Sequence, residues 1–110
     1  MAYLIHCLYR PGGAQERLAI RRRHIEHMLE WLPRTVFGSA ILGDGAEPIG
    51  MVVALSVDDE AEARRFIDDE PYHRAGLFGV VAVNRLVQMT PPHTREVLER
   101  ELGVSSFSVQ

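Results

Sequence analysis

Hydrophobic and polar residues change their spacing several times along the chain, and each change marks a predicted element. Residues 2–9 mix aromatic and aliphatic side chains and stop at Arg10-Pro11-Gly12-Gly13, which predicts a strand followed by a turn. From residue 14 to residue 32 the apolar spacing becomes three and four, which predicts a long amphipathic helix that ends at Pro33. The apolar arc of this helix consists of Leu18, Ile25, Met28, Leu29 and Leu32.

The middle of the chain returns to strand-like composition. Residues 35–42 predict a second strand, which Gly38 weakens because a glycine has no side chain to pack. A loop rich in glycine, aspartate and proline follows over residues 43–50, and residues 51–57 predict a third strand. These two strands and the short loop between them have the pattern of an antiparallel pair.

The last part of the chain predicts two helices with a strand between them. Asp59 is an acidic N-cap with Glu62 three residues later, and the helix that it begins runs to about Asp69. Residues 77–87 have the strongest strand composition of the chain. A third helix is expected over residues 94–102, with Gly103 ending it.

The order of these elements is β-α-β-β-α-β, which predicts an α+β fold: a ferredoxin-like antiparallel sheet with its helices on one face. Residues 1–90 would form this domain, and residues 91–110 a C-terminal helical extension. Strands one, three and four are apolar on both faces, but two helices cover only one face. We therefore expect a homodimer that packs two sheets together. The terminal helix is expected to pack on its own protomer or on the partner through Val97, Leu98 and Leu102.

Composition narrows the function classes. The chain has 110 residues, enough for one core, and its net charge of -3 argues against a dedicated nucleic-acid binder, which needs a basic surface. No apolar run approaches the roughly 20 residues of a membrane span, and no signal-peptide pattern precedes the first strand. The one cysteine, Cys7, has no partner for an internal disulfide. We expect a cytoplasmic protein with neither a nucleic-acid nor a membrane partner.

The first predicted helix carries the first candidate for chemistry. When successive residues turn by about 100° and Ile25 marks the centre of the apolar arc, Arg21 lies about 40° away and His24 about 100° away. An arginine inside an apolar stripe either extends along the surface to water or points into a polar pocket, where it would bind an anion. His24 lies at the edge of the arc, where it is either a hydrogen-bonded boundary residue or a site residue.

His24 and His27 also have the spacing that allows two imidazoles to bind one metal ion. His27, however, falls about 160° from the centre of the apolar arc and is predicted to face water. No cysteine or third histidine lies close in the sequence. We therefore expect no metal site.

A second candidate is the acidic segment that ends the second long helix. Asp68, Asp69 and Glu70 precede Pro71-Tyr72. Acids at a helix C-terminus oppose the helix dipole, so they are unfavourable unless they have partners. The segment is either a functional cluster or a solvated acidic surface with Tyr72 packed at the edge of the core.

These motifs together resemble the YciI-like family of dimeric α+β barrels over residues 1–87. The matching segments are Arg21-x-x-His24; Phe37-Gly38-Ser39 with Asp44-Gly45-x-x-Pro48-x-Gly50; Glu62-Ala63 to Phe66; and Glu70-Pro71-Tyr72-x-x-Ala75-Gly76-Leu77-Phe78-x-x-Val81-x-Val83. The resemblance implies a ferredoxin-like protomer that dimerises through its sheet. It also implies a pocket in which a histidine and an acid form a catalytic pair.

His24 matches the histidine of that pair, and Glu70 stands where the family has an aspartate in an Asp-Pro-Tyr element. The acid is therefore one methylene longer, which makes a water-bridged contact possible and leaves Asp69 as an alternative partner. A second departure is Ser39, where the family has proline after the glycine. The terminal helix lies outside the matched region, so the resemblance implies nothing about it.

The sequence leads to one main functional hypothesis. A cofactor-independent enzyme would carry out proton transfer, as an elimination or isomerisation, on a small oxygenated organic acid or phenol. His24 would be the general base, Glu70 would orient it, Arg21 would hold an anionic substrate and Tyr72 would line the pocket. The alternative is a non-catalytic ligand-binding or accessory protein that uses the same cleft. A haem- or quinone-handling monooxygenase is disfavoured because the chain has one tryptophan and few clustered aromatic residues.

Overall fold

A computed structural model describes the backbone of residues 1–109 and the side chains of residues 1–103. Its centre is one sheet of four strands, β1 (Ala2–Tyr9), β2 (Thr35–Leu42), β3 (Pro48–Ser56) and β4 (Phe78–Leu86). The strands lie in the order β2-β3-β1-β4, and each is antiparallel to its neighbours. This is the sheet of a ferredoxin-like chain, so the predicted α+β fold is confirmed.

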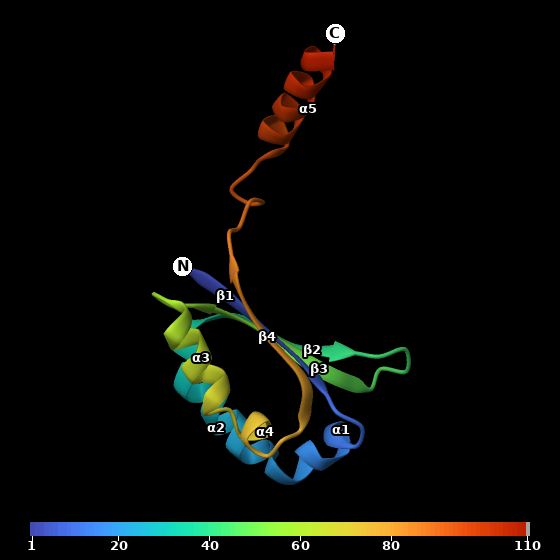
Figure 1. Cartoon of the computed structure of the whole chain (residues 1–110), viewed down its shortest axis with the longest axis vertical. Helices are drawn as coiled ribbons and strands as arrows, with labels where there is room; N and C mark the ends of the chain where they lie inside the picture. Colours follow the sequence, from blue (N-terminus) through green and yellow to red (C-terminus); the bar gives the residue numbers. More distant parts are fainter. Residues whose placement is uncertain (110) are drawn as a thin grey trace.

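Two groups of helices connect these strands. Between β1 and β2 lie α1 (Gly13–Glu16), the 3-10 turn η1 (Arg17–Ile20), α2 (Arg21–Trp31) and a second 3-10 turn, η2 (Leu32–Arg34). Between β3 and β4 lie α3 (Glu60–Asp68) and α4 (Pro71–Arg74). Figure 1 shows α2, α3 and α4 on the same side of the sheet. The sequence predicted one continuous helix over residues 14–32. This prediction is wrong, because the 3-10 turn η1 separates α1 from α2.

The core lies between the sheet and these helices. Alternation along β1 directs Tyr3, Ile5 and Cys7 toward the helices, and all three are buried. Phe66 of α3 and Leu55 of β3 pack with them. A helix layer on one face of the sheet thus buries one side chain in two along the central strand.

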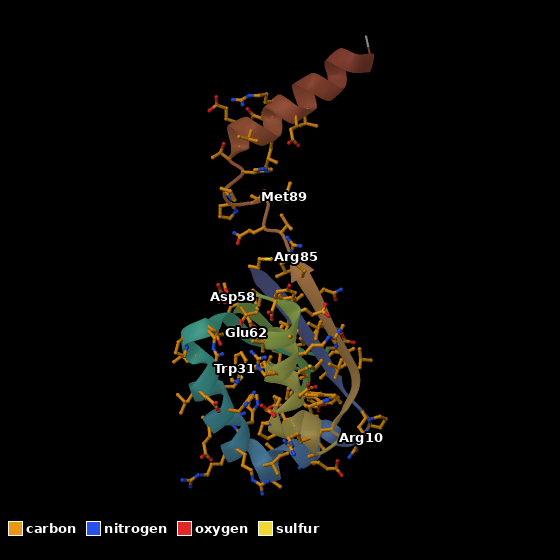
Figure 2. All side chains as sticks on the ribbon, turned by 60° about the vertical axis from the view of Figure 1, so that its left-hand side comes forward. Arg10, Trp31, Asp58, Glu62, Arg85 and Met89 are labelled. Atoms are coloured by element: carbon orange, nitrogen blue, oxygen red, sulfur yellow. The ribbon has the colours of Figure 1, made fainter. Side chains whose placement is uncertain are left out.

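The start of α3 follows the predicted capping pattern. The Asp59 carboxylate accepts a hydrogen bond from the backbone N–H of Glu62 at 2.9 Å. The Glu62 carboxylate accepts one in return from the N–H of Asp58 at 2.9 Å, and Figure 2 shows Asp58 and Glu62 close together at this end. The reciprocal bond reaches one residue beyond the N-cap, and both contacts satisfy donors that the first turn leaves free.

The face that α2 turns to the sheet differs from the predicted one. Of the predicted apolar arc only Met28 packs against the core, and Leu29 is 63% exposed. The buried residues of the helix are His27 and Trp31. The His27 ring Nε2 lies 2.9 Å from the carbonyl oxygen of Phe66, and the Trp31 ring packs edge-on against the Phe66 ring. The prediction that His27 faces water is therefore wrong, because a ring with a hydrogen-bond partner can be buried.

The second face of the sheet carries apolar side chains without a covering layer. Leu4, His6 and Leu8 of β1 point to this face and are half-buried, and Val80 of β4 is exposed beside Leu8. Among the described residues no helix lies on this side of the sheet (Figure 1). This is the face through which we predict the homodimer.

The C-terminal helix α5 (Arg95–Val109) stands apart from the sheet. The chain leaves β4 near Arg85, passes Met89 and leads to a helix that projects away from the domain (Figures 1 and 2). The radius of gyration is 18.0 Å, against about 13 Å for a compact domain of similar length. The helix continues through Gly103, where we expected it to end, and Leu98 and Leu102 are exposed. Among the side chains that the structure describes, packing of this helix on its own protomer is not found; packing on a partner stays a prediction.

None of the helices in the described part of the chain combines the length and the apolar composition needed to cross a bilayer.

Candidate active site

A cavity of about 290 Å³ lies between the sheet and the helical segment that runs from η1 to α2. Strands β2 and β3 form its apolar side, and η1, α2 and α4 contribute its polar groups. Its size suits a small ligand, since ligand pockets begin at about 300 Å³. The lining residues are Tyr9, Arg17, Arg21, His24, Met28, Gly38, Ser39, Ala40, Pro48, Gly50, Met51, Val53 and Tyr72.

His24 lines this cavity, and its ring contacts Glu70, which is not itself a lining residue. The His24 ring Nδ1 lies 2.6 Å from Glu70 Oε1, although 46 residues separate the two in the chain. The His24 side chain is 15% exposed and the Glu70 side chain is fully buried. The longer acid thus reaches the imidazole directly, without the bridging water that we considered. Such a short contact is typical of a hydrogen bond between charged or partly charged groups.

The local sequence explains why Glu70 points inward. Pro71 begins α4, and Glu70 is the N-cap of that helix, with Oε2 accepting a hydrogen bond from the backbone N–H of His73 at 3.0 Å. The acid therefore lies at the N-terminus of a new helix, where the helix dipole favours a negative charge. Asp69, the alternative partner of His24, lies instead 3.8 Å from Arg74 on the exposed surface. We expected either Glu70 or Asp69 to contact His24, and the structure shows that Glu70 does.

Aromatic stacking fixes the other face of the imidazole. The rings of His24 and Tyr72 are stacked, with centroids 4.2 Å apart and planes 10° from parallel. Tyr72 in turn packs edge-on against Tyr9 and Phe78. With Nδ1 held by Glu70 and the ring held by Tyr72, Nε2 is the nitrogen left for a ligand. This arrangement prepares His24 to exchange a proton with one.

Two arginines line the cavity, one predicted and one missed. Arg21 lies there as we expected, and Arg17 of η1 lies one turn earlier on the same side. The sequence did hold a signal, because Arg17 and Arg21 are four residues apart and such residues share a helix face. Tyr9, at the end of β1, is a second lining residue that the sequence analysis did not select. Only Arg21 falls inside the resemblance motif, which explains why the other two were missed.

The hydroxyl groups of the two tyrosines are held in their protonated form. Burial raises the pKa of Tyr72, and the guanidinium charge of Arg21 acts against this rise. Burial also raises the pKa of Tyr9, with the Tyr72 hydroxyl as the next cause. Both hydroxyls are therefore hydrogen-bond donors at neutral pH.

Cys7 lies in the core and does not line the cavity. Burial, with a smaller contribution from the charge of Glu70, raises the pKa of its thiol to about 12. A thiol with so high a pKa is a poor nucleophile. Cys7 is therefore a packing residue.

The two histidines that we considered as a metal pair have different partners. His24 contacts Glu70, whereas His27 contacts the backbone oxygen of Phe66. Among the side chains that the structure describes, no group of three or more His, Cys, Asp or Glu residues is arranged to hold a metal ion. His27 therefore belongs to the packing between α2 and α3.

A family model and solved structures are similar to this chain. The family model for the YCII-related domain matches residues 1–87, which confirms the resemblance seen in the sequence. No curated protein matches the chain.

Solved structures are also similar to this chain, among them the following two. One is 5-chloro-2-hydroxyhydroquinone dehydrochlorinase (TftG) from Burkholderia phenoliruptrix AC1100, in complex with 2,5-dihydroxybenzoquinone. It is 25% identical with a TM-score of 0.74, covering 80% of this chain and 95% of that one. The other, from Bacteriodes thetaiotaomicron VPI-5482, is named as a candidate antibiotic biosynthesis monooxygenase. It is 15% identical with a TM-score of 0.50, covering 86% and 93%, and this likeness shows the fold alone.

Proposed function

The chain belongs to the YCII-related domain family, and from that premise we propose that it is a cofactor-independent enzyme that transfers protons. The reaction is an elimination or isomerisation of a small oxygenated organic acid or phenol. The observation that carries this proposal is the 2.6 Å contact between His24, which lines the cavity, and the fully buried Glu70. Residues 1–90 contain every group that the proposal uses.

In this mechanism His24 is the general base. Glu70 accepts the hydrogen bond from Nδ1–H, which keeps the lone pair of the neutral imidazole on Nε2. When Nε2 takes a proton from the substrate, the carboxylate beside Nδ1 stabilises the imidazolium that forms. The stacked Tyr72 ring holds the imidazole in one orientation throughout.

In both proposed reactions, Nε2 of His24 takes a proton from the substrate and leaves an electron pair behind. In an elimination, the electron pair left by the proton forms a new double bond, and the leaving group departs with its own bonding pair. In an isomerisation, the proton returns from Nε2 to another atom of the same substrate. Arg21 holds the negative charge that develops on the substrate, and Tyr72 lines the pocket beside it.

The structural neighbour supports the substrate class. That protein is named for dehydrochlorination of a hydroxylated hydroquinone, which is an elimination, and it was solved with a dihydroxybenzoquinone. A single six-membered ring of this kind is compatible with a cavity of about 290 Å³. We extend to this chain only the class of a small hydroxylated ring.

The assembly and the location belong to the same proposal. Two copies would pack through the bare face of the sheet, where apolar side chains of β1 and β4 lie uncovered. We propose that this homodimer works in the cytoplasm.

The test is a panel of small rings: 5-chloro-2-hydroxyhydroquinone, chlorinated catechols, and hydroxylated and lactone acids. Each is incubated with the purified protein while absorbance and chloride release are followed, and a thermal shift records binding. We expect turnover of at least one compound. Binding of several compounds without turnover of any would contradict the enzyme proposal and favour the alternative, a ligand-binding or accessory protein.

A further inference from the structure

Two positive charges in the cavity lack a counter-charge. Arg17 and Arg21 both line it, and neither forms an ion pair with any carboxylate among the described side chains. Other arginines of the chain, such as Arg22 and Arg64, pair with a glutamate one turn away. Arg17 and Arg21 differ from these two arginines because no carboxylate of the described side chains pairs with them, and because both line the cavity.

Glu70, the acid that contacts His24, does not neutralise these arginines. Its Oε1 contacts His24 and its Oε2 accepts a hydrogen bond from the His73 N–H. Both carboxylate oxygens are thus already used. Arg21 is exposed and Arg17 is half-buried, so both guanidinium groups stay free to bind an anion, and the cavity favours a ligand that brings a negative charge.

Two buried donor atoms point to the same conclusion. The Nη1 atom of Arg17 and the hydroxyl oxygen of Tyr72 are buried, and neither has a hydrogen-bond partner among the described residues. A buried donor without an acceptor is costly, so native structures pair such groups. Both residues line the one cavity, so an oxygen acceptor placed inside it would satisfy them together.

We propose that Arg17 is a further substrate-binding residue, and that Arg17, Arg21 and the Tyr72 hydroxyl together hold an ionised oxygen of a small ring compound. The substrate therefore binds as an anion, with the charge at the arginines and the atom that loses the proton at His24. The proposal rests on the proposed function for the identity of the site, but it concerns binding. The ionised oxygen is either a ring phenolate or a carboxylate attached to the ring.

The raised pKa of Tyr72 agrees with this role. Burial raises it, and the nearby charges of Arg21 and Arg17 do not remove the rise. The hydroxyl thus stays protonated and can donate to an anion. A guanidinium binds an anionic oxygen through charge-assisted hydrogen bonds, and a neutral phenolic hydroxyl can donate one more to the same oxygen.

The test for a phenolate uses 4-nitrocatechol, whose visible absorbance changes when its hydroxyl ionises. The protein-bound compound is titrated with pH and compared with the free compound. We expect bound 4-nitrocatechol to ionise at least about one pH unit lower, which is a tenfold change in its ionisation equilibrium. A second arm compares the binding of gentisate with that of hydroquinone, because these two rings differ by one carboxylate.

Three variants assign the effect to Arg17. Arg17→Met keeps the length of the side chain and removes the charge, so it should abolish most of the shift and of any gentisate preference. Arg17→Lys should restore part of both. Arg22→Met is the matched control, since Arg22 lies on the same helical segment with its side chain 95% exposed, and it should behave as the wild type. Circular dichroism checks that each variant is folded.

The outcomes separate clearly. A shift with 4-nitrocatechol identifies a phenolate ligand, and a gentisate preference of tenfold or more identifies a carboxylate. The proposal is overturned if the wild type shows neither effect, or if folded Arg17→Met matches the wild type. Absence of turnover in the ring panel would count against the enzyme proposal alone, because these measurements need no reaction.

Discussion

Glu70 does two things at once, and both depend on the length of its side chain. One oxygen caps α4 and the other holds His24, while the side chain is fully buried. A shorter acid at the same backbone position would have to satisfy the helix N–H and the imidazole with one methylene less. The glutamate therefore couples the local fold of α4 to the orientation of the proposed base.

This coupling predicts the stability of two variants. Glu70→Ala removes the cap and leaves the His24 N–H without an acceptor, so it should lower the free energy of unfolding by about 2–4 kcal/mol. Glu70→Gln keeps an oxygen for one of the two bonds and should cost about half as much. Urea denaturation measures both. Asp69→Asn, on the exposed neighbour, is the control and should change stability by less than about 0.5 kcal/mol; equal effects of Glu70→Ala and Asp69→Asn would contradict the assignment.

The raised pKa of the Cys7 thiol leads us to expect a loss of stability at alkaline pH. Its thiol pKa is raised from 9.0 to about 12 in the folded protein, chiefly by burial. Below pH 9 the thiol is protonated in both states, but between pH 9 and about 12 only the unfolded chain releases the proton. Stability attributable to Cys7 therefore falls as pH rises through this range, by up to about 1.4 kcal/mol per pH unit.

Urea denaturation at about pH 8 and about pH 10 checks this, with Cys7→Ala as the comparison. We expect the wild type to lose roughly 1 kcal/mol more than Cys7→Ala over this interval. The tyrosines titrate in both proteins, so their contribution cancels. An equal loss in the two proteins would show that the thiol is not held protonated by the fold.

The site was partly predictable at the level of single residues. The spacing of Arg21 and His24, together with the resemblance through Glu70-Pro71-Tyr72, selected four residues, of which Arg21, His24 and Tyr72 line one cavity. The fourth, Glu70, contacts His24. Arg17 was not predictable in the same way. It precedes the break between η1 and α2, and an arginine without a counter-charge becomes informative only when its surroundings are known.

At the scale of elements, the strands were predicted better than the helix that carries the site. Alternation and turn residues located β1, β2 and β4 within about one residue. For α2 the helical spacing was predicted correctly, but the buried face was not. The prediction placed apolar residues on the buried face and did not consider that histidine and tryptophan rings, which carry polar atoms, can be buried there. His27 and Trp31 are buried through contacts with Phe66, a residue in another helix. Such contacts lie outside any local pattern.

The buried face of α2 can be tested with two substitutions. Trp31 packs in the core, so Trp31→Ala should lower the free energy of unfolding by about 3–5 kcal/mol. Leu29 is 63% exposed, so Leu29→Ala should change it by no more than about 0.5 kcal/mol. Thermal and urea unfolding measure both variants. A large loss for Leu29→Ala would show that the predicted arc, rather than the observed face, packs on a surface.

At the scale of the whole molecule, the two faces of the sheet differ in what covers them. One face carries the core and the cavity, and the other presents apolar side chains. Among the described residues no helix covers this second face (Figure 1). The apolar pattern of the strands predicted this second face, but it could not predict that α5 would project away from the domain. The local sequence pattern of an amphipathic helix does not determine whether the helix packs against its own chain or against a partner.

The bare face predicts the oligomeric state. A sheet-to-sheet dimer should bury well over about 1,000 Å² in total and persist at micromolar concentration. Sedimentation velocity should therefore give a dimer for the wild type. Val80→Glu places a charge on the bare face and should shift the protein toward monomer, whereas Leu29→Glu on the outer side of α2 should not. A monomeric wild type would contradict the dimer.

The central claim is that His24, held by Glu70, moves the proton in the reaction of this protein. The most direct measurement is the steady-state rate of the wild type and of His24→Asn with the best substrate of the ring panel. We predict that kcat falls by about 100-fold or more while KM changes by only a few fold, because a general base contributes about 10²–10⁴. The asparagine amide keeps an N–H that can donate to Glu70, so the variant should remain folded and dimeric, as circular dichroism and sedimentation velocity will check. If folded His24→Asn keeps more than half of the wild-type kcat, His24 is not the base and the account is wrong.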